Sequence, residues 1–448
     1  MEYSEIVRRQ KEYFAGNATK TLEHRLETLR LLEGLLKKNE AHFLEALEED
    51  LGKSADEAFM TEIGIVYEEI RFMKRHLKKW MKAKSVKTAM THLASKAWTI
   101  HEPYGAVLVI SPWNYPYQLA LTPLIGAIAS GNTVVLKPSE LAPKTSDMLF
   151  QVLSKFHEEI TAVVLGDALQ TTKLLQEPFD YCFFTGSSRV GKLIMGQVAE
   201  QLMPVTLELG GKSPLIVSKD ADLKLAAKRV AFGKWLNAGQ TCIAPDYAFV
   251  DQQVYDQFKQ ELIIAIRELY GENPLENKNY GRIVNQAHFK RLRSYVDGIQ
   301  MDEQTLKMAP FLLENPDPDS SVMQEEIFGP ILPLYSYQNL EDVLRFIKER
   351  PKPLALYLFT KNRELERKVL FETSSGSVCV NDTLMQISTP YLPFGGVGAS
   401  GMGSYHGYQS FETFSHQKSV LRQPNWLDFG FRYPSSKWRG KILRLIFK

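Results

Sequence analysis

This chain of 448 residues has few cysteines and almost no excess of positive or negative charge. Only three cysteines occur, Cys182, Cys242 and Cys379, so a disulfide-stabilised fold is excluded and a reducing compartment, the cytoplasm, is expected. Lys and Arg total 54 and Asp and Glu total 52, which leaves a net charge of +2. That balance argues against a nucleic-acid-binding protein and against a disordered acidic tail.

Long apolar runs and metal-ligand clusters are also lacking. No stretch reaches the ~18 uncharged apolar residues that a membrane-spanning helix needs. The N-terminal segment MEYSEIVRRQKEYFAG is charged throughout, which is not typical of a secretory signal. The nine histidines are scattered without a Cys or His partner at ligand spacing, so no metal site is expected. A large cytoplasmic enzyme is the remaining interpretation.

The sequence does contain clear helical and strand patterns. Leu22, Leu26, Leu29, Leu32 and Leu36 recur at spacings of three and four, which predicts an amphipathic helix, and a second one is expected over residues 60–80. The segments GAVLVISPWNYP, GNTVVLKPSE, TAVVLG and DYCFFTGS then alternate with helical stretches. Short apolar strands between helices predict an α/β protein with a parallel sheet, whose ligands bind at the carboxyl ends of the strands.

Cys242 is the cysteine whose surroundings are compatible with chemistry. It lies in NAGQTCIAPDY, where Gly239 permits a tight turn and free backbone amides would lower the pKa of a thiol. From this segment alone, an inert buried cysteine is the favoured interpretation, because it is the commoner fate of a lone cysteine. Cys182 and Cys379 lie in apolar strand-like runs, which indicates inert thiols.

Two further residues are candidates for general-base and oxyanion chemistry. Glu208 lies between two leucines in TLELGGKSP, where burial would raise its pKa and suit it to accept a proton; a salt-bridged glutamate at a strand end fits the spacing equally well. Asn114 follows a strand end, and its amide would be a donor to an oxyanion, although a turn asparagine is the simpler interpretation.

Two strand ends carry residues suited to a nucleotide. In FFTGSSRVGK, Gly186 and Gly191 lie between a strand and a helix, which is a weak pattern for a phosphate at a helix N-terminus. In KPSE, Lys137 and Glu140 are placed to hydrogen-bond ribose hydroxyls. KPSE is also a helix start, with Pro138 or Ser139 at the cap, and the two interpretations are compatible.

Taken together, PWNYP, KPSE, FTGS, LELGGKSP, GQTC, EEIFGP and PFGG occur in an order that resembles the NAD(P)-dependent aldehyde dehydrogenase superfamily. The resemblance extends from about Leu22 to about Tyr433. The segments NAGQTCIAPDY, PYLPFGGVG and FRYPSS, with the short N-terminus, look most like the class 3 branch of dimeric enzymes, and within it like the bacterial members.

The resemblance implies roles for particular residues. Cys242 matches the nucleophile, Glu208 the general base that hydrolyses the thioester, and Asn114 the oxyanion donor. The cofactor, NAD with NADP also plausible, is implied to lie against the following set: Trp113, Lys137, Glu140, Thr185, Gly186, Ser187, Val190, Gly191, Leu209, Gly210, Glu326 and Phe328. The implied reaction is oxidation of an aldehyde to the carboxylic acid. The aromatic residues of PWNYPY, with Trp235, favour a medium- or long-chain aliphatic or an aromatic aldehyde.

The implied fold is α/β, with a Rossmann-like cofactor domain, an α/β catalytic domain and a small β bridging element that pairs subunits of a homodimer. These parts are predicted, in this order, at 1–80 with 104–206, at 207–420, and at 81–103 with a C-terminal strand at 421–434. Residues 435–448 form a basic amphipathic tail. This tail would meet an anionic membrane surface peripherally, or pack on the partner subunit or the substrate entrance.

Two alternatives to this function remain open. In an acylating enzyme, coenzyme A or phosphate would capture the thioester; an intact Glu208 argues against it. A non-catalytic structural protein with the same fold would be expected to lack Cys242 or Glu208, and the sequence has both.

Overall fold

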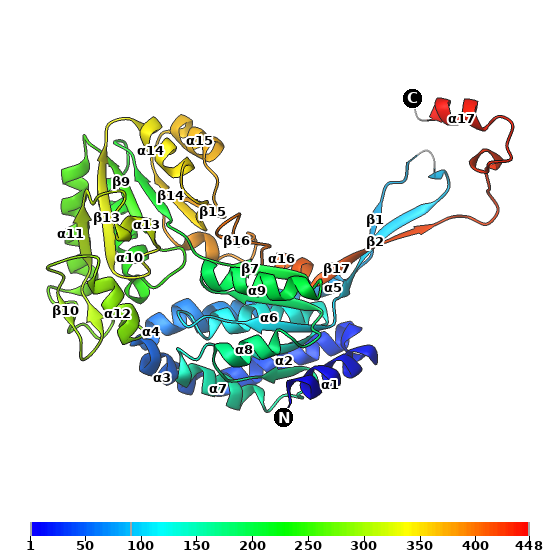
Figure 1. The fold of residues 1–448 in the computed structure, drawn as a ribbon, viewed down its shortest axis with the longest axis horizontal. Coiled ribbons are helices and arrows are strands. Elements are labelled where there is room, and N and C mark those ends of the chain that lie inside the picture. Colours follow the sequence, from blue (N-terminus) through cyan, green and yellow to red (C-terminus); the bar gives the residue numbers. More distant parts are fainter. Residues whose placement is uncertain (1, 90–91, 447–448) are drawn as a thin grey trace.

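The computed structural model describes residues 2–89 and 92–446. Met1, residues 90–91 of the predicted bridging element and residues 447–448 of the predicted tail lie outside this range. The described chain forms a two-lobed body from which a long β arm projects (Figure 1).

The described part of the first 80 residues is helical, as predicted. Its helices are α1 (Tyr3–Ala15), α2 (Leu22–Lys38), α3 (Glu40–Leu51), α4 (Ala55–Ala58) and α5 (Gly64–Trp80), with one π-helical turn, η2 (Phe59–Ile63). Helix α2 begins where the Thr21 side chain accepts a hydrogen bond from the His24 N–H at 3.2 Å. Its leucines at positions 29, 32 and 36 are buried in the core, which confirms the predicted apolar face.

The first lobe is built on a sheet with the order β16-β7-β6-β3-β4-β5 within the described residues. Its strands are β3 (Ala106–Ile110), β4 (Thr133–Lys137), β5 (Thr161–Val163), β6 (Tyr181–Thr185), β7 (Val205–Glu208) and β16 (Gly401–Met402). All neighbours are parallel except β16, which is antiparallel to β7. The chain leaves β3 first toward β4 and later toward β6, so the ligand crevice is expected at the carboxyl ends of β3 and β6.

Four helices connect or flank these strands. They are α6 (Gln118–Ser130), α7 (Pro143–Leu153), α8 (Ala168–Leu174) and α9 (Ser188–Glu200). Every residue of α6 is buried, because it passes between the sheet and helices α2 and α5 (Figure 1). This agrees with its sequence QLALTPLIGAIAS, which is apolar on all faces.

The second lobe has a parallel sheet with the order β12-β13-β9-β8-β14-β15 in the described chain. Its strands are β8 (Pro214–Val217), β9 (Tyr247–Asp251), β12 (Phe311–Glu314), β13 (Ile331–Tyr337), β14 (Ala355–Phe359) and β15 (Ser377–Val380). A separate two-stranded ribbon joins β10 (Met301–Asp302) and β11 (Lys307–Met308).

The helices of this lobe pack around its sheet (Figure 1). They are α10 (Leu223–Trp235), α11 (Tyr255–Tyr270), α12 (Gln286–Arg293), α13 (Ser321–Gln324), α14 (Leu340–Lys348) and α15 (Arg363–Glu372). After them, α16 (Tyr408–Thr413) returns to the first lobe and packs on α6. Strand β16 likewise returns to the first sheet, although its residues were predicted in the second domain at 207–420.

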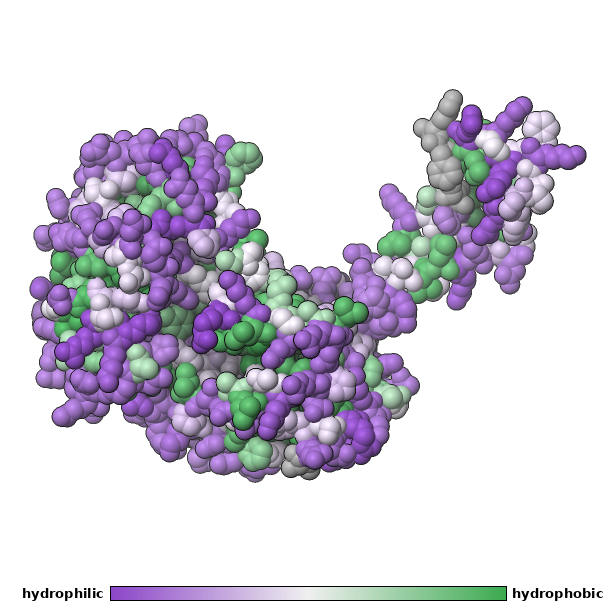
Figure 2. All heavy atoms as spheres, in the orientation of Figure 1, coloured by the Kyte–Doolittle hydropathy of each residue, from purple (hydrophilic) through white to green (hydrophobic). Residues whose placement is uncertain are grey.

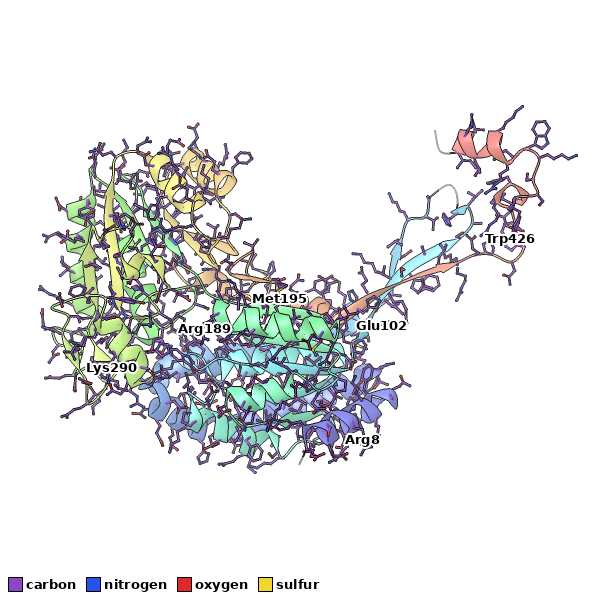
Figure 3. All side chains as sticks on the ribbon, in the orientation of Figure 1. Arg8, Glu102, Arg189, Met195, Lys290 and Trp426 are labelled. Carbon is purple, nitrogen blue, oxygen red and sulfur yellow. The ribbon has the colours of Figure 1, made fainter. Side chains whose placement is uncertain are left out.

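The arm is an antiparallel sheet of β1 (Lys84–Val86), β2 (Lys96–Pro103) and β17 (Ser415–Arg422). Figure 3 places Glu102 where the arm leaves the body and Trp426 beyond the end of β17. The predicted C-terminal strand at 421–434 is therefore wrong in position: β17 runs over Ser415–Arg422. Pro424 has no N–H to donate to a ladder, and this is the physical reason why pairing ends there.

After the arm, the chain continues into a turn, η6 (Gly430–Arg432), and a short helix, α17 (Arg439–Ile446), far from the body (Figure 1). Trp426, Trp438 and Leu445 are largely exposed. Apolar residues interrupt the hydrophilic surface of this projecting arm (Figure 2). No helix in the described part of the chain is long and apolar enough to span a membrane.

Candidate active site

Glu208 is the last residue of β7, at the carboxyl edge of the first sheet, where it pairs with Gly401. Its side chain is buried, and neither carboxylate oxygen has a hydrogen-bond partner among the described residues. Burial without compensation raises the pKa of Glu208 well above its ordinary value. The salt-bridged alternative is wrong for this residue, since no ion pair of Glu208 occurs in the described chain.

Cys242 lies in the turn between α10 and β9 of the second lobe. Before it, Asn237, Ala238 and Gly239 all have left-handed backbone angles, with φ of 53°, 51° and 76°. Burial, together with the carboxyls of Glu326 and Glu208, raises the pKa of the Cys242 thiol to about 12. The expectation of a lowered pKa is therefore wrong for this structure, because desolvation outweighs the backbone N–H groups that lower it.

Glu208 and Cys242 line the same pocket of about 190 Å³, which lies between the two lobes. Its walls are mostly apolar and include Met60, Ile65, Leu119, Leu209, Phe232, Leu236, Ile243, Leu354, Leu384, Ile387 and Phe394. Two tyrosines, Tyr115 and Tyr405, and the hydroxyl residues Thr185 and Thr241 also face it. The arrangement combines a thiol, a buried carboxyl and an apolar chamber.

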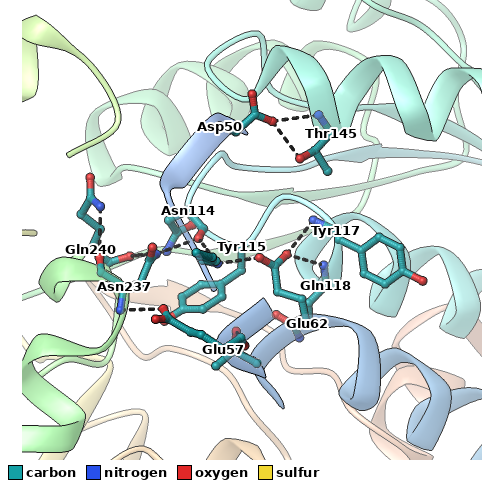
Figure 4. Close-up of polar contacts among 12 residues, drawn as sticks. Asp50, Glu57, Glu62, Asn114, Tyr115, Tyr117, Gln118, Thr145, Asn237 and Gln240 are labelled. Carbon is teal, nitrogen blue, oxygen red and sulfur yellow. Dashed lines mark hydrogen bonds and ion pairs between the residues drawn. The ribbon is translucent and has the colours of Figure 1, made fainter. Parts of the chain in front are cut away.

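Asn114 is held beside the turn that carries Cys242 (Figure 4). Its side-chain amide Nδ2 donates to the backbone oxygen of Gln240 at 3.0 Å. One N–H of this amide is thereby engaged, and an amide nitrogen has two. The second N–H is the one that can serve as a donor to substrate.

The residues predicted to hold a dinucleotide gather at the carboxyl ends of β3, β4 and β6. Lys137, which ends β4 and is buried, is ion-paired with half-exposed Glu140 at 2.9 Å. Ser187 caps helix α9 by accepting from the Val190 N–H at 3.4 Å, and the hydroxyl of Thr185 is buried without a partner among the described residues. A helix N-terminus beside an unsatisfied hydroxyl and a Lys–Glu pair suits a phosphate and a ribose, so these residues fit a dinucleotide.

Two glycines among the predicted cofactor residues, Gly191 and Gly210, are closely packed against neighbouring side chains. A Cβ at Gly191 would meet Leu209 at 2.7 Å, and a Cβ at Gly210 would clash with the Glu326 carboxylate. The Gly186 N–H donates to the Glu208 backbone oxygen at 3.0 Å, which links the α9 turn to the base. Only residues without a side chain allow these elements to approach so closely.

Glu326, Phe328 and Trp113 are the remaining residues predicted to contact the cofactor. The Trp113 and Phe328 rings meet edge to face with centroids 5.3 Å apart. Burial and the neighbouring Asp246 raise the pKa of Glu326 to about 8. Phe328 has a φ of 49°, an uncommon angle for an aromatic residue, which shows that the surrounding structure fixes this loop.

Sequence patterns did not indicate several charged residues around the site. Lys234 is fully buried, its Nζ has no hydrogen-bond partner in the described chain, and burial lowers its pKa to about 8. Lys53, Glu57 and Glu62 lie beneath Asn114 and are all buried. Asn237 and Gln240 belong to the NAGQTC motif, so that motif was a signal for them; the three N-terminal residues have no local signal. No cluster of three or more potential metal ligands occurs among residues 2–89 and 92–446.

Comparison with known proteins identifies the family of this chain. The sequence profile of the Aldehyde dehydrogenase family matches residues 1–420. The chain belongs to this family. The resemblance seen in the sequence is thereby confirmed, and the protein is an aldehyde dehydrogenase, an enzyme that oxidises aldehydes to acids with NAD or NADP.

Three relatives illustrate the match. The 4,4'-diaponeurosporen-aldehyde dehydrogenase of Staphylococcus aureus is 45% identical, over 98% of this chain and 97% of that protein. The rat "Aldehyde dehydrogenase, dimeric NADP-preferring" is 42% identical, over 93% of this chain and 94% of that protein. A solved structure of Staphylococcus aureus AldH in a substrate-bound state superposes with a TM-score of 0.96, at 44% identity and 99% coverage of both chains. This aldehyde dehydrogenase therefore has the predicted α/β fold with a Rossmann-like part.

Proposed function

We propose that this aldehyde dehydrogenase uses Cys242 as nucleophile, Glu208 as general base and Asn114 as oxyanion donor. The observation that carries the proposal is the buried Glu208 carboxyl, which lines the pocket of Cys242 and has no partner within the described residues. A carboxyl kept unpaired in an apolar wall is costly to bury and is poised to take a proton.

The first half of the reaction forms a bond to Cys242. The thiol proton moves to Glu208 or Glu326, the two carboxyls that act electrostatically on the thiol, and is released to solvent before hydrolysis; the thiolate attacks the aldehyde carbon. The free N–H of Asn114 donates to the oxyanion of the thiohemiacetal, a contact of a kind worth about 2.7–4 kcal/mol. The chemistry that NAD or NADP supplies when bound is acceptance of the hydride, after which a thioester remains on Cys242.

The second half releases the acid. Glu208 accepts a proton from a water molecule, whose oxygen attacks the thioester carbon. The carbon–sulfur bond breaks, the carboxylic acid leaves, and Cys242 regains its proton. A thioester is well suited to this step because it stays reactive toward water while a base is present.

The apolar walls of the pocket favour a medium- or long-chain aliphatic or an aromatic aldehyde. A 45%-identical relative carries the name of 4,4'-diaponeurosporen-aldehyde, which supports a large substrate. For the cofactor, the Glu140 carboxylate favours NAD, because the 2′-phosphate of NADP would bring like charge toward it. Lys137, at 2.9 Å from Glu140, offsets part of that repulsion, so NADP use is retained.

The test is product formation by the purified full chain with straight-chain aldehydes of increasing length and with benzaldehyde. We expect NADH and carboxylic acid in equal amounts without coenzyme A, and kcat/KM rising with chain length. Acid that forms only when coenzyme A or phosphate is added would instead favour the acylating alternative. Flat kcat/KM across the series would contradict the apolar substrate class.

We also propose a cytoplasmic homodimer that pairs through the arm of β1, β2 and β17. The three free cysteines support the compartment, and the description of the rat relative as dimeric supports the assembly. Helix α17, with exposed Trp438 and Leu445 beside basic residues, would contact a membrane surface, the partner subunit or the substrate entrance. Sedimentation with and without anionic vesicles, for the full chain and a chain ending at residue 434, distinguishes these contacts.

A further inference from the structure

A buried ion pair lies directly beneath the residue proposed to bind the oxyanion. Lys53, in the loop between α3 and α4, and Glu62, in the π-helical turn η2, are 2.5 Å apart, and both side chains have zero exposure. Lys53 Nζ also donates to the backbone oxygen of Asn114 at 3.0 Å and lies 3.9 Å from the centroid of the Tyr115 ring. The ammonium is therefore satisfied by a carboxylate, a carbonyl and an aromatic face.

The carboxylate of Glu62 binds the other end of the same segment (Figure 4). Its Oε2 accepts from the backbone N–H groups of Tyr117 at 2.8 Å and Gln118 at 3.2 Å, at the N-terminus of helix α6. An anion at this position also interacts favourably with the helix dipole. The ion pair thus binds the backbone of Asn114 through Lys53 and the start of α6 through Glu62, which restricts the segment between them.

A second set of contacts joins this segment to the turn of Cys242. Asn237 Nδ2 donates to the Asn114 backbone oxygen at 2.8 Å and to the Gln240 backbone oxygen at 3.2 Å. The Glu57 carboxylate accepts from the Asn237 N–H at 3.0 Å, which holds this residue in its left-handed conformation. The backbone oxygen of Gln240, two residues before Cys242, accepts the hydrogen bond from the Asn114 side-chain amide.

We propose that the supporting network of Lys53, Glu57, Glu62, Asn114, Asn237 and Gln240 positions the oxyanion donor against the thiol, with the Lys53–Glu62 pair as its anchor. Lys53 and Glu62 are positioning residues: they act through Asn114. This inference rests on the proposed role of Asn114. Lys53 does not act as a free charge at the oxyanion, because Glu62 neutralises it at 2.5 Å.

Stability alone does not require such a pair. Replacing a buried ion pair with apolar residues of similar size is often neutral or stabilising. Precise placement of a donor does require a rigid support, since a shift of about 1 Å near reacting atoms can cost as much as 100-fold in rate. The Lys53–Glu62 pair lies under Asn114 and its polar groups are hydrogen-bonded, so it is suited to hold the donor rigidly rather than to stabilise the fold.

A double-mutant cycle with Asn114→Ala tests the inference. The pair variant carries Lys53→Met and Glu62→Gln together, which removes both charges and keeps an acceptor oxygen for the N–H groups of Tyr117 and Gln118. Asn114→Ala keeps the backbone carbonyl that Lys53 and Asn237 bind, so it removes only the side-chain donor. The readout is kcat/KM for the best aldehyde of the series, below the melting temperature of every variant.

We expect the pair variant to lower kcat/KM about tenfold in the parent background and less than about twofold in the Asn114→Ala background. The same factor in both backgrounds, or no loss in the parent background, would overturn the positioning role while leaving Asn114 as the oxyanion donor. An Asn114→Ala enzyme with unchanged kcat/KM would overturn the oxyanion role itself and this inference with it.

Two further variants keep the test decisive. If the pair variant does not fold, Asn237→Gly replaces it: glycine accepts the left-handed angle, and the loss of both Asn237 donors should show the same dependence on Asn114. The matched control is Lys74→Met with Glu33→Gln, which removes an ion pair between α5 and α2 that does not touch the site. This control pair is partly buried. The kcat/KM of the control should match the parent in both backgrounds, and a tenfold loss there would show that removing an ion pair away from the site has the same effect.

Discussion

Two groups of polar residues in the same site differ in whether their hydrogen bonds are satisfied. In the reactive cluster of Glu208 and Cys242, both carboxylate oxygens of Glu208 have no hydrogen-bond partner within the described chain. In the supporting network, Lys53, Glu62 and the Asn114 amide are all bonded. The carboxyl that must exchange protons is left unsatisfied, whereas the buried ion pair that holds Asn114 in place has its hydrogen-bond partners.

The difference has opposite consequences for stability. A buried polar group without a partner costs free energy of folding, and each such group in the reactive cluster is a cost accepted for chemistry. A buried charge that has all its partners contributes little to the free energy of folding, but removing one partner destabilises the protein. Substitutions in the two groups should therefore differ in both activity and stability.

The largest effect is expected from removing the nucleophile of the reactive cluster. Cys242→Ser should lower kcat by on the order of 10⁴–10⁶-fold, because a hydroxyl cannot replace the thiol nucleophile here. Steady-state NADH formation measures it, and the melting temperature should stay near that of the parent. Cys379→Ser is the matched control and should remain active; an inactive but folded Cys379→Ser enzyme would contradict the assignment.

The next effect concerns the base. Glu208→Gln should give an initial burst of NADH and then turn over about 10²–10⁴-fold more slowly, because acylation precedes the step that needs the base and Glu326 remains beside the thiol. Stopped-flow absorbance measures both phases. Steady turnover like that of the parent, without a burst, would exclude Glu208 from thioester hydrolysis.

In the supporting network, the single substitution Lys53→Met should destabilise the fold by about 3–5 kcal/mol, because it leaves the Glu62 charge buried and unpaired. Denaturant unfolding measures this free energy. Adding Glu62→Gln should recover much of the loss, since no unpaired charge then remains. A Lys53→Met protein as stable as the parent would show that the ion pair is not the anchor of this network.

Glu208→Gln should change stability in the direction opposite to Lys53→Met: at neutral pH it should stabilise the fold. The folded-state pKa of Glu208 is raised, so the folded protein holds this proton longer than the unfolded chain, and parental stability falls as the pH rises from about 4.3 toward the folded value. Each unit of that shift corresponds to about 1.4 kcal/mol. The variant should match the parent near pH 4 and exceed its melting temperature at pH 8. A lower melting temperature at pH 8 would contradict the view that this carboxyl is uncompensated.

The smallest effect is expected among the residues proposed to bind the cofactor, where the half-exposed Glu140 is paired with the buried Lys137. Glu140→Gln should narrow the preference for NAD over NADP by no more than about fivefold, mainly through KM for NADP, because exposed charges interact by less than about 1 kcal/mol. The measurement is kcat/KM for both cofactors in parent and variant. A parent that prefers NADP, or an unchanged ratio, would show that Glu140 does not set the choice.

Local patterns predicted much of this molecule. The leucine spacing of α2 and the apolar runs of β3, β4, β5 and β6 are properties of short segments, and the structure confirms each of them. The C-terminal strand was misplaced because the predicted strand at 421–434 continues past Pro424, whereas β17 ends at Arg422. The direction of the Cys242 pKa was wrong because nearby amides are visible in the sequence and burial is not.

By itself, the sequence determined most of the secondary structure and the chemical types of the reacting groups, because each is encoded within a few consecutive residues, and it determined the family through the order of seven short motifs. Only the tertiary structure decided which polar groups are satisfied. Lys53 lies 61 residues before Asn114 and Asn114 lies 126 before Gln240; the first contact forms only when the first lobe folds, and the second only when the two lobes pack together. Burial and hydrogen-bond satisfaction depend on everything that packs around a side chain, so the separation of a reactive cluster from its supporting network is a property of the folded chain alone.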